Sequence, residues 1–133
     1  MLKYMLDTSI CVELLNGNEH VRNLCVEHND ECCISPIVAM ELLYGAYNAP
    51  KKYRDHEVEK AKLLINHYPM VGIDDDVDFF VTEKLRLESI GMSIEDFDLL
   101  IGTSCQVSNL TIVTHNVKHF NRIQGLPFED WTE

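Results

Sequence analysis

The sequence predicts an α/β fold in which helical crossovers connect the strands of one central parallel sheet, with four or five strands. Short apolar runs alternate along the chain with longer segments of helical periodicity, a pattern typical of parallel sheets. The 133 residues, 46% of them hydrophobic, suffice for one domain with its own core and are too few for two. No repeat, low-complexity segment or linker divides the sequence, so we expect a single domain over residues 1–133.

The start of the sequence predicts a strand, two helices and a second strand. Residues 2–6 form a short apolar run that ends abruptly at an acid, and we expect the first strand there. Helical patterns follow at 9–16 and 19–29, and the turn signature Asn16-Gly17-Asn18 separates them. The next apolar run, Cys-Cys-Ile-Ser at 32–35, predicts the second strand.

The middle of the chain predicts three helices and one weak strand. Pro36 opens the first helix, at a position where a missing backbone N–H costs nothing. Residues 52–67 form an amphipathic pattern and predict the second helix. The run Met-Val-Gly-Ile at 70–73 predicts the third strand, and the acidic start Asp74-Asp75-Asp76 leads into a helix that ends near Ile90.

The last third of the chain completes the sheet. A helical pattern covers residues 94–109, and Leu-Thr-Ile-Val-Thr at 110–114 predicts the fourth strand. The tail, with Pro127, Phe128 and Trp131, favours a short edge strand. The expected boundaries hold to within a few residues.

The chain is strongly acidic, with 11 Lys and Arg against 22 Asp and Glu and a net charge of -11. A domain that holds nucleic acid by charge alone usually presents a basic face, so this composition argues against indiscriminate binding. A local basic rim is still compatible with it, and the cluster Lys51, Lys52 and Arg54 is our candidate for contacts to RNA. The alternative is that these cations form an ordinary solvated helix face.

Hydropathy and cysteine usage favour a cytoplasmic protein. The apolar run at the N-terminus is only a few residues long before an acid interrupts it, which suits neither a signal peptide nor a membrane span. The cysteines are odd in number and lack C-x-x-C spacing, so we expect reduced, mostly buried thiols rather than zinc ligands or disulfides. They are Cys11, Cys25, Cys32, Cys33 and Cys105.

Glu41 is the first acid that a solvated surface does not explain. It is the only charged residue in Ile-Val-Ala-Met-Glu-Leu-Leu-Tyr-Gly-Ala-Tyr, and apolar residues share its face at helical spacing. An unpaired carboxylate in such a setting is destabilised by several kcal/mol, so it needs a cation or a hydrogen-bond donor. A metal ion is one such partner, and a structural Arg or a buried hydrogen bond is the other.

Asp98 raises the same question in the helix predicted at 94–109. It lies between Ile94 and Ile101 on the buried stripe, too far into the helix to cap it. Asp96 has a simpler alternative, because Ser93 and Asp96 match the S-x-x-D form of a capping box.

Asp7 is the third candidate acid beside Glu41 and Asp98, and it lies at the carboxyl end of the first predicted strand. It is suited to cap the following helix, but ligands of open α/β sheets also bind at this edge. Glu41 follows the second strand by about one helical turn, so the three acids converge on one edge. Their mutual repulsion favours a divalent cation, and oxygen ligands alone suit Mg²⁺ or Mn²⁺ rather than Zn²⁺.

Four short motifs together resemble a known family. The chain resembles the PIN-domain ribonucleases, specifically the VapC toxins of type II toxin–antitoxin pairs, and its C-terminal segment Asn-Arg-Ile-Gln-Gly-Leu-Pro-Phe-Glu-Asp-Trp resembles the enteric branch that cuts initiator tRNA. The motifs are, in order, Asp7-Thr8-Ser9, Glu41-Leu42-Leu43-Tyr44-Gly45, Asp98-Leu99-Leu100-Ile101-Gly102 and Thr114-His115-Asn116. Each motif is weak alone, but their joint order over nearly the whole chain is specific.

This resemblance implies a PIN-like three-layer α/β/α sandwich, a homodimer or toxin–antitoxin hetero-oligomer, dependence on Mg²⁺ or Mn²⁺, and neutralisation by a VapB-type antitoxin. The implied enzyme is an endoribonuclease in which Asp7, Glu41 and Asp98 hold the cation and Asp96 is an optional outer ligand. The residues expected to orient water or phosphate are Thr8, Ser9, Thr114 and Asn116.

The sequence also departs from the family pattern. Ser9 stands where Asn is usual, and Asn116 and His119 occupy the segment where a further acid often lies, which favours one firmly bound metal ion. Two alternatives remain open: a PIN-type nuclease that acts on DNA or in RNA maturation, and a PIN-like binding module with low activity.

Overall fold

The computed structural model describes residues 1–73 and 77–133, and one parallel sheet lies at its centre. The strands are β1 (Tyr4–Leu6), β2 (Cys32–Cys33), β3 (Thr111–Val113) and β4 (Phe128–Glu129). Their order is β2-β1-β3-β4, and every neighbouring pair runs parallel. The predicted α/β fold and parallel sheet are confirmed, and β4 is the edge strand expected in the tail.

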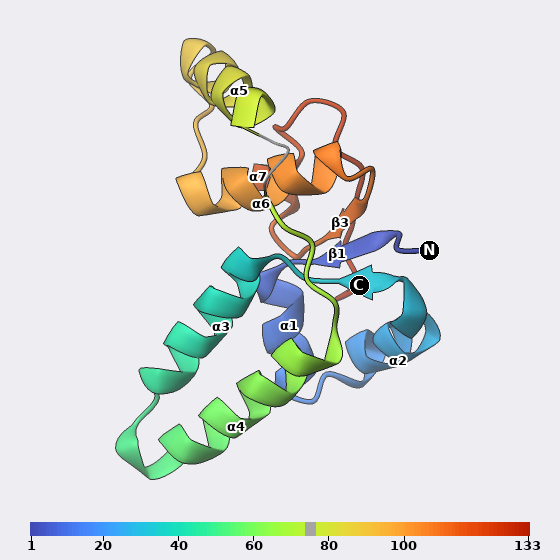
Figure 1. Ribbon diagram of the computed structural model, residues 1–133, viewed down its shortest axis with the longest axis vertical. Coiled ribbons are helices and arrows are strands. Elements are labelled where there is room, and N and C mark those ends of the chain that lie inside the picture. Colours follow the sequence, from blue (N-terminus) through green and yellow to red (C-terminus); the bar gives the residue numbers. More distant parts are fainter. Residues whose placement is uncertain (74–76) are drawn as a thin grey trace.

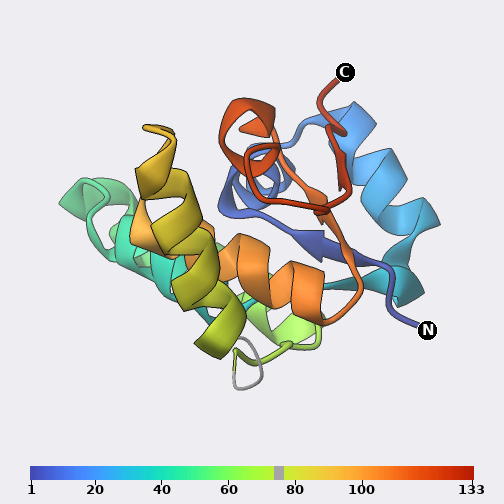
Figure 2. The same ribbon diagram turned by 90° about the horizontal axis from the view of Figure 1, so that it is seen from above.

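Two helical layers enclose this sheet and make the three-layer α/β/α sandwich (Figure 1). In Figure 1, α1 to α4 lie below the strands, and α5 and α6 lie above them. Figure 2 shows the same sheet from above, with α6 along one face and both chain ends at the right of the view. The helices are α1 (Thr8–Leu15), α2 (Glu19–Glu27), α3 (Pro36–Tyr47), α4 (Lys51–His67), α5 (Val77–Ser89), α6 (Asp96–Val107) and the short α7 (Val117–Phe120), with a 3₁₀ turn at Asn29–Glu31.

Local sequence explains why α3 begins where it does. Ser35 is its N-cap, and its hydroxyl accepts a hydrogen bond of 3.1 Å from the N–H of Ile37. Pro36 occupies the first turn, where its fixed backbone angle suits the helix. This rigid start sets the direction of α3 directly after β2.

Two expectations about local structure were wrong. Residues 70–73 form no strand, but only an isolated parallel bridge between Met70 and Ile34, and the carbonyl of Gly72 accepts a hydrogen bond from Ser104 of α6 instead. The helix expected at 94–109 begins at Asp96, with Glu95 as N-cap and no side-chain capping bond, so the Ser93–Asp96 capping box does not form. The short helix α7 was not foreseen. The predicted helix start at 74–76 lies outside the described residues.

All five cysteines are buried free thiols, as expected. Burial raises the pKa of Cys32 and of Cys33 to about 12, which keeps both protonated. In the part of the chain that the structure describes, no helix has the length and apolar character to cross a bilayer.

A nearly buried ion pair fastens α5 to the loop after α7. The Glu83 carboxylate, only 4% exposed, accepts hydrogen bonds from Arg86 at 2.8 and 2.9 Å and from the N–H of Gln124 at 3.0 Å. Arg86 also donates to the carbonyl of Arg122 at 2.7 Å. These contacts connect two segments that are far apart in the sequence.

We expect Glu83→Gln to lower the free energy of unfolding by about 1–3 kcal/mol, because it removes the charge that Arg86 pairs with. Hydrogen bonds from Arg86 lower the pKa of Glu83 below its ordinary 4.5. Stability from this group is therefore complete above pH 4.5 and is lost as the pH falls through the lowered folded-state pKa. Urea unfolding at neutral pH and at pH 3 checks both points, and an equal difference from wild type at the two pH values would contradict them.

Candidate active site

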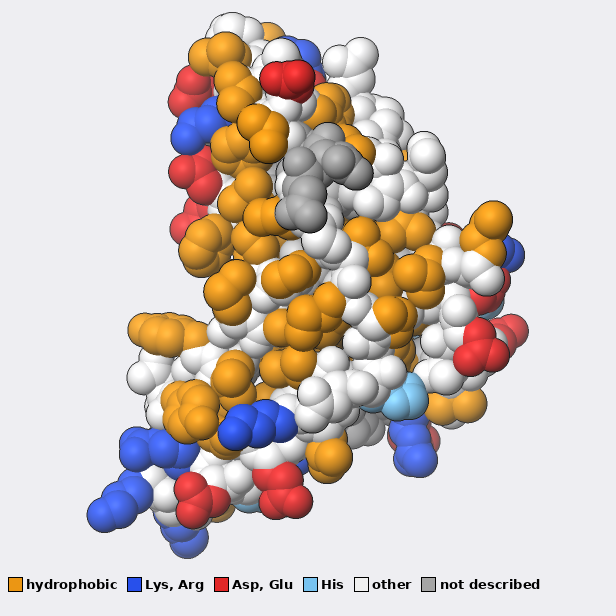
Figure 3. Space-filling model, in the orientation of Figure 1, with side chains coloured by type: hydrophobic (Ala, Val, Ile, Leu, Met, Phe, Trp, Pro, Cys, Tyr) orange, Lys and Arg blue, Asp and Glu red, His pale blue; other side chains and the backbone are white. Residues whose placement is uncertain are grey.

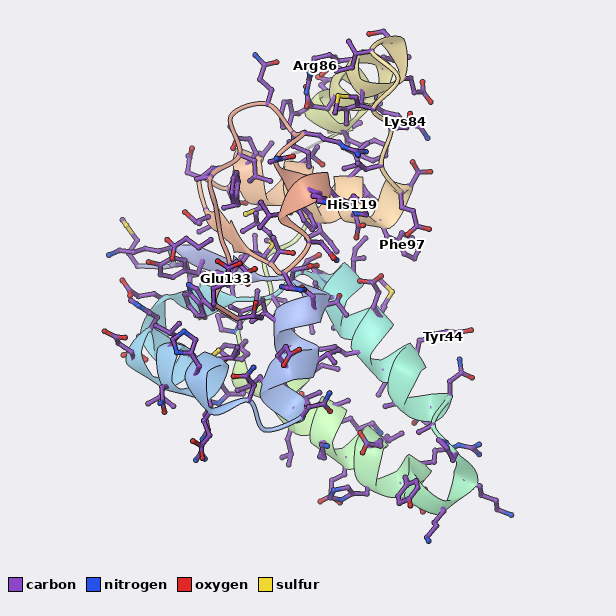
Figure 4. All side chains as sticks on the ribbon, turned by 180° about the vertical axis from the view of Figure 1, so that it is seen from behind. Tyr44, Lys84, Arg86, Phe97, His119 and Glu133 are labelled. Carbon is purple, nitrogen blue, oxygen red and sulfur yellow. The ribbon has the colours of Figure 1, made fainter. Side chains whose placement is uncertain are left out.

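The three predicted carboxylates converge at the carboxyl edge of the sheet. Asp7 follows β1 directly, Glu41 lies in the second turn of α3 after β2, and Asp98 lies in the first turn of α6. Their proximity is visible in the electrostatics, because burial and then the charges of Asp7 and Glu41 raise the pKa of Asp98 to about 6. Figure 4 shows that the neighbours Tyr44 on α3 and Phe97 on α6 project on the same side of the molecule.

Asp7 is held by hydroxyl groups rather than by a cation. The residue is 2% exposed, and its Oδ2 accepts hydrogen bonds from Thr114 Oγ1 at 2.8 Å and from Ser9 Oγ at 3.1 Å. It occupies the N-cap position of α1, but its side chain makes no capping hydrogen bond. Burial raises the pKa of Asp7, and the hydrogen bond from Thr114 opposes that shift.

The carboxylate of Glu41 is hydrogen-bonded to a neutral donor, the hydroxyl group of Thr8. Its Oε1 accepts a short hydrogen bond of 2.6 Å from Thr8 Oγ1 at the start of α1. The Lys and Arg ion pairs within the described residues all involve other acids, so neither Asp7 nor Glu41 is neutralised by one of them. A hydrogen bond, one alternative to a cation for Glu41, is therefore present but only partly buried, and the charge of Glu41 is still available to a cation.

Asp98 lies against His119, whereas Asp96 points elsewhere. The Oδ2 of Asp98 is 3.7 Å from Nδ1 of His119 on α7, and the Asp98 side chain is 19% exposed. Asp96 is 60% exposed and pairs with Lys84 of α5 at 2.9 Å. The structure thus groups Asp98 with Asp7 and Glu41 but pairs Asp96 outside this group, and its part in metal binding stays a prediction.

The supporting polar residues form one connected network. Thr114, which is fully buried, donates to Asp7, lies 3.5 Å from Ser9 Oγ, and accepts from the N–H of Asn116 at 2.9 Å. Thr8 joins the same edge through Glu41. Each residue predicted to orient water or phosphate therefore lies at this edge of the sheet.

The donor chemistry suits Mg²⁺ or Mn²⁺, because the grouped ligands are carboxylate and hydroxyl oxygens. Within residues 1–73 and 77–133, no group of three His, Cys, Asp or Glu side chains is arranged closely enough to hold a metal ion. Asp7, Glu41 and Asp98 therefore have to draw together to share one ion. Their mutual repulsion, which contributes to the raised pKa of Asp98, opposes this approach until a divalent cation offsets it.

The basic cluster of Lys51, Lys52 and Arg54 is not part of this acidic edge. It begins α4, at the far end of the α3–α4 hairpin, where Lys and Arg side chains gather at the lower left of Figure 3. A groove of about 400 Å³ between α1, α3 and α4 reaches from Thr8 and Glu41 to Pro50 and Tyr53 near this cluster. The groove thus connects the acidic edge with the basic end.

Comparison with known proteins identifies the family of this chain. The family model of the PIN domain matches residues 4–126. The chain belongs to the PIN-domain family. Ribonuclease VapC2 of Rickettsia felis is 34% identical over 132 residues, which are 96% of this chain and 97% of that protein. The tRNA(fMet)-specific endonuclease VapC of Salmonella typhimurium is 31% identical over 133 residues, covering 98% of this chain and 99% of that protein.

A solved PIN-domain structure shares the fold. The crystal structure of DNA-bound VapBC from Salmonella typhimurium matches with a TM-score of 0.90 and 28% identity, over 98% of this chain and 99% of the compared chain. The family resemblance drawn from four short motifs is therefore confirmed, and so is the PIN-like α/β/α sandwich.

Proposed function

We propose that this PIN-domain chain is a divalent-metal-dependent endoribonuclease, the VapC toxin of a type II toxin–antitoxin pair, and that it hydrolyses a phosphodiester bond in a tRNA. The observation that carries the proposal is the convergence of Asp7, Glu41 and Asp98 at one edge of the sheet. Full-length similarity to a tRNA(fMet)-specific endonuclease supports tRNA(fMet) as the substrate. Such a substrate is cytoplasmic, and we expect the chain to act there.

The residues of this chain have distinct parts in the proposed reaction. Asp7, Glu41 and Asp98 would hold one Mg²⁺ or Mn²⁺, which when bound makes a water molecule more acidic and offsets charge on the phosphate. Thr8 orients the carboxylate of Glu41, while Thr114 and Ser9 orient that of Asp7. Asn116 is exposed beside this network, and its side-chain amide would hydrogen-bond the phosphate.

A VapB-type antitoxin is the expected partner. Among the similar solved structures are VapBC complexes from Salmonella typhimurium and Rickettsia felis. The net charge of -11 suits a partner with a basic segment, in which an Arg pairs with the carboxylates of the site.

We also propose a homodimer. Val77, Val81 and Leu85 are spaced four residues apart on one exposed face of α5, and Tyr44 and Phe97 add exposed aromatic rings on α3 and α6. Exposed apolar residues gathered on one helix face often mark an interface. Light scattering on the purified chain measures its oligomeric state.

The test of the proposed function compares substrates with and without metal. We expect the purified chain to cut tRNA(fMet) with Mg²⁺ or Mn²⁺, to stop when EDTA is added, and to recover when the metal is restored. Single-stranded DNA and ribosomal RNA serve as the competing substrates of other PIN-type nucleases. A chain that binds no Mn²⁺ by calorimetry and cuts none of the substrates would be a binding module instead.

A further inference from the structure

A second hollow adjoins the acidic edge, and of the described residues that line it only Asn116 has a part in the reaction proposed above. It measures about 650 Å³, and its walls come from the loop after β3, from α7 and from the segment that begins with β4. Asn116 belongs to both places, since its N–H donates to Thr114, which donates to Asp7. His119, labelled on α7 in Figure 4, also lines the hollow and lies 3.7 Å from Asp98.

His115 is fixed in this hollow from two sides. Its backbone N–H donates to Ser9 Oγ at 3.0 Å, and its ring Nδ1 lies 3.1 Å from Oδ2 of Asp130 and 3.0 Å from Oγ1 of Thr132. Because an ionised carboxylate only accepts hydrogen bonds, Nδ1 carries the proton toward Asp130. The ring is 64% exposed, and Nε2 has no hydrogen-bond partner in the part of the chain that the structure describes. A preoriented hydrogen-bonding group therefore faces the hollow.

The other groups of the hollow match a nucleotide. Phe128 on the edge strand β4 exposes 42% of its surface, and Lys118 on α7 is exposed without an ion-pair partner among the described residues. Exposed aromatic rings beside a cation and hydrogen-bonding side chains are how proteins bind unpaired bases of RNA.

The acidic side chains that line the hollow restrict which ligands can bind in it. Asp130 is occupied by His115 and Thr132, and Oε1 of Glu129 accepts from the indole N–H of Trp131 at 3.0 Å. Glu129 and Glu133 still add negative charge, so a run of phosphates would be repelled. One base with a single neighbouring phosphate is the ligand that fits.

We propose that this hollow is the subsite for an unpaired nucleotide next to the scissile phosphate: Phe128 stacks on the base, His115 binds its edge, and Lys118 contacts one phosphate. This inference rests on the proposed function. It explains how the same active site would select an RNA that presents an unpaired nucleotide in a loop. It also accounts for substrate binding by a chain whose overall charge opposes RNA.

The test measures binding separately from cleavage. Fluorescein-labelled tRNA(fMet) is titrated with the full chain in EDTA, where no cleavage occurs, and anisotropy gives Kd. We expect Phe128→Leu, which keeps an apolar side chain but removes the ring, to weaken binding about tenfold. Lys118→Gln should weaken binding and reduce the slope of log Kd against log salt by about one. With metal present, Phe128→Leu should raise KM more than it lowers kcat.

Matched controls are exposed residues outside the hollow. Tyr47 is 52% exposed at the end of α3, and Lys62 is exposed on α4, so Tyr47→Leu and Lys62→Gln remove an exposed aromatic ring and a cation elsewhere. The subsite is overturned if Phe128→Leu binds and cuts like wild type, if its loss equals that of Tyr47→Leu, or if wild type binds no tRNA in EDTA. Cleavage by wild type that depends on metal would in each case leave the proposed function standing.

Discussion

Asp7→Asn is expected to reduce RNA cleavage by at least about a thousandfold while the metal-free protein stays as stable as wild type or becomes more stable. The loss follows because the substitution removes one of the charges that hold the cation, and the metal supplies both an activated water and charge stabilisation. Stability is preserved because burial already raises the pKa of Asp7, so its ionised form is unfavourable in the absence of a cation. An amide oxygen can still accept from Thr114 and Ser9.

Cleavage of tRNA(fMet) and thermal unfolding in EDTA, measured on the same preparations, separate these two effects. Asp78→Asn makes the same chemical change at an exposed position of α5 and should leave both quantities unchanged. Wild-type cleavage by Asp7→Asn would remove the central assumption about the site. A large drop in its thermal stability would instead make Asp7 a structural residue.

The second large effect concerns pH. The pKa of Asp98 is about 6 in the metal-free protein, raised from 3.8, so below pH 6 a proton occupies the group that the cation needs. We expect Mn²⁺ affinity to fall about tenfold between pH 7 and pH 5 and to change little above pH 7. Protons and the cation compete for the Asp98 carboxylate, so a falling pH favours protonation and a rising pH favours metal binding.

Calorimetry in buffers of different ionisation enthalpy measures this competition directly, because binding near pH 6 should release a fraction of a proton from Asp98. In Asp98→Asn the remaining affinity should vary less with pH than in wild type. An affinity that is the same at pH 5 and pH 7 would mean that Asp98 does not hold the cation.

The candidate acids could be singled out because an acid within an apolar pattern is unusual in a sequence. Glu41 is the only charge in a long apolar helix, and Asp98 interrupts a buried stripe, so their positions alone required partners. Asp7 was predictable from topology, since ligands of parallel sheets bind where the strands end. In the structure the charges of Asp7 and Glu41 contribute to the raised pKa of Asp98, and the role of the three acids as metal ligands stays a prediction.

Other features depend on contacts between segments that are distant in the sequence. Nothing in the sequence near Asp96 indicates that Lys84 of the preceding helix pairs with it, and this pairing replaces the expected capping box. The run at 70–73 has the composition of a strand, yet Ser104 of α6 takes the carbonyl that a sheet would use. The hydrogen bond between Thr8 and Glu41 likewise appears only when α1 and α3 pack together.

The acidic edge of the sheet is also hydrogen-bonded to Glu129 and Asp130. The N–H of Thr114 donates to the carbonyl of Glu129 at 2.9 Å, and His115 is held by Asp130. An affinity tag or fusion partner placed directly after Glu133 would therefore disturb the segment whose hydrogen bonds position Thr114 and His115. Thr114 in turn donates a hydrogen bond to Asp7. Met1 is fully exposed at the other terminus, which makes the N-terminal end the safer attachment point for recombinant work.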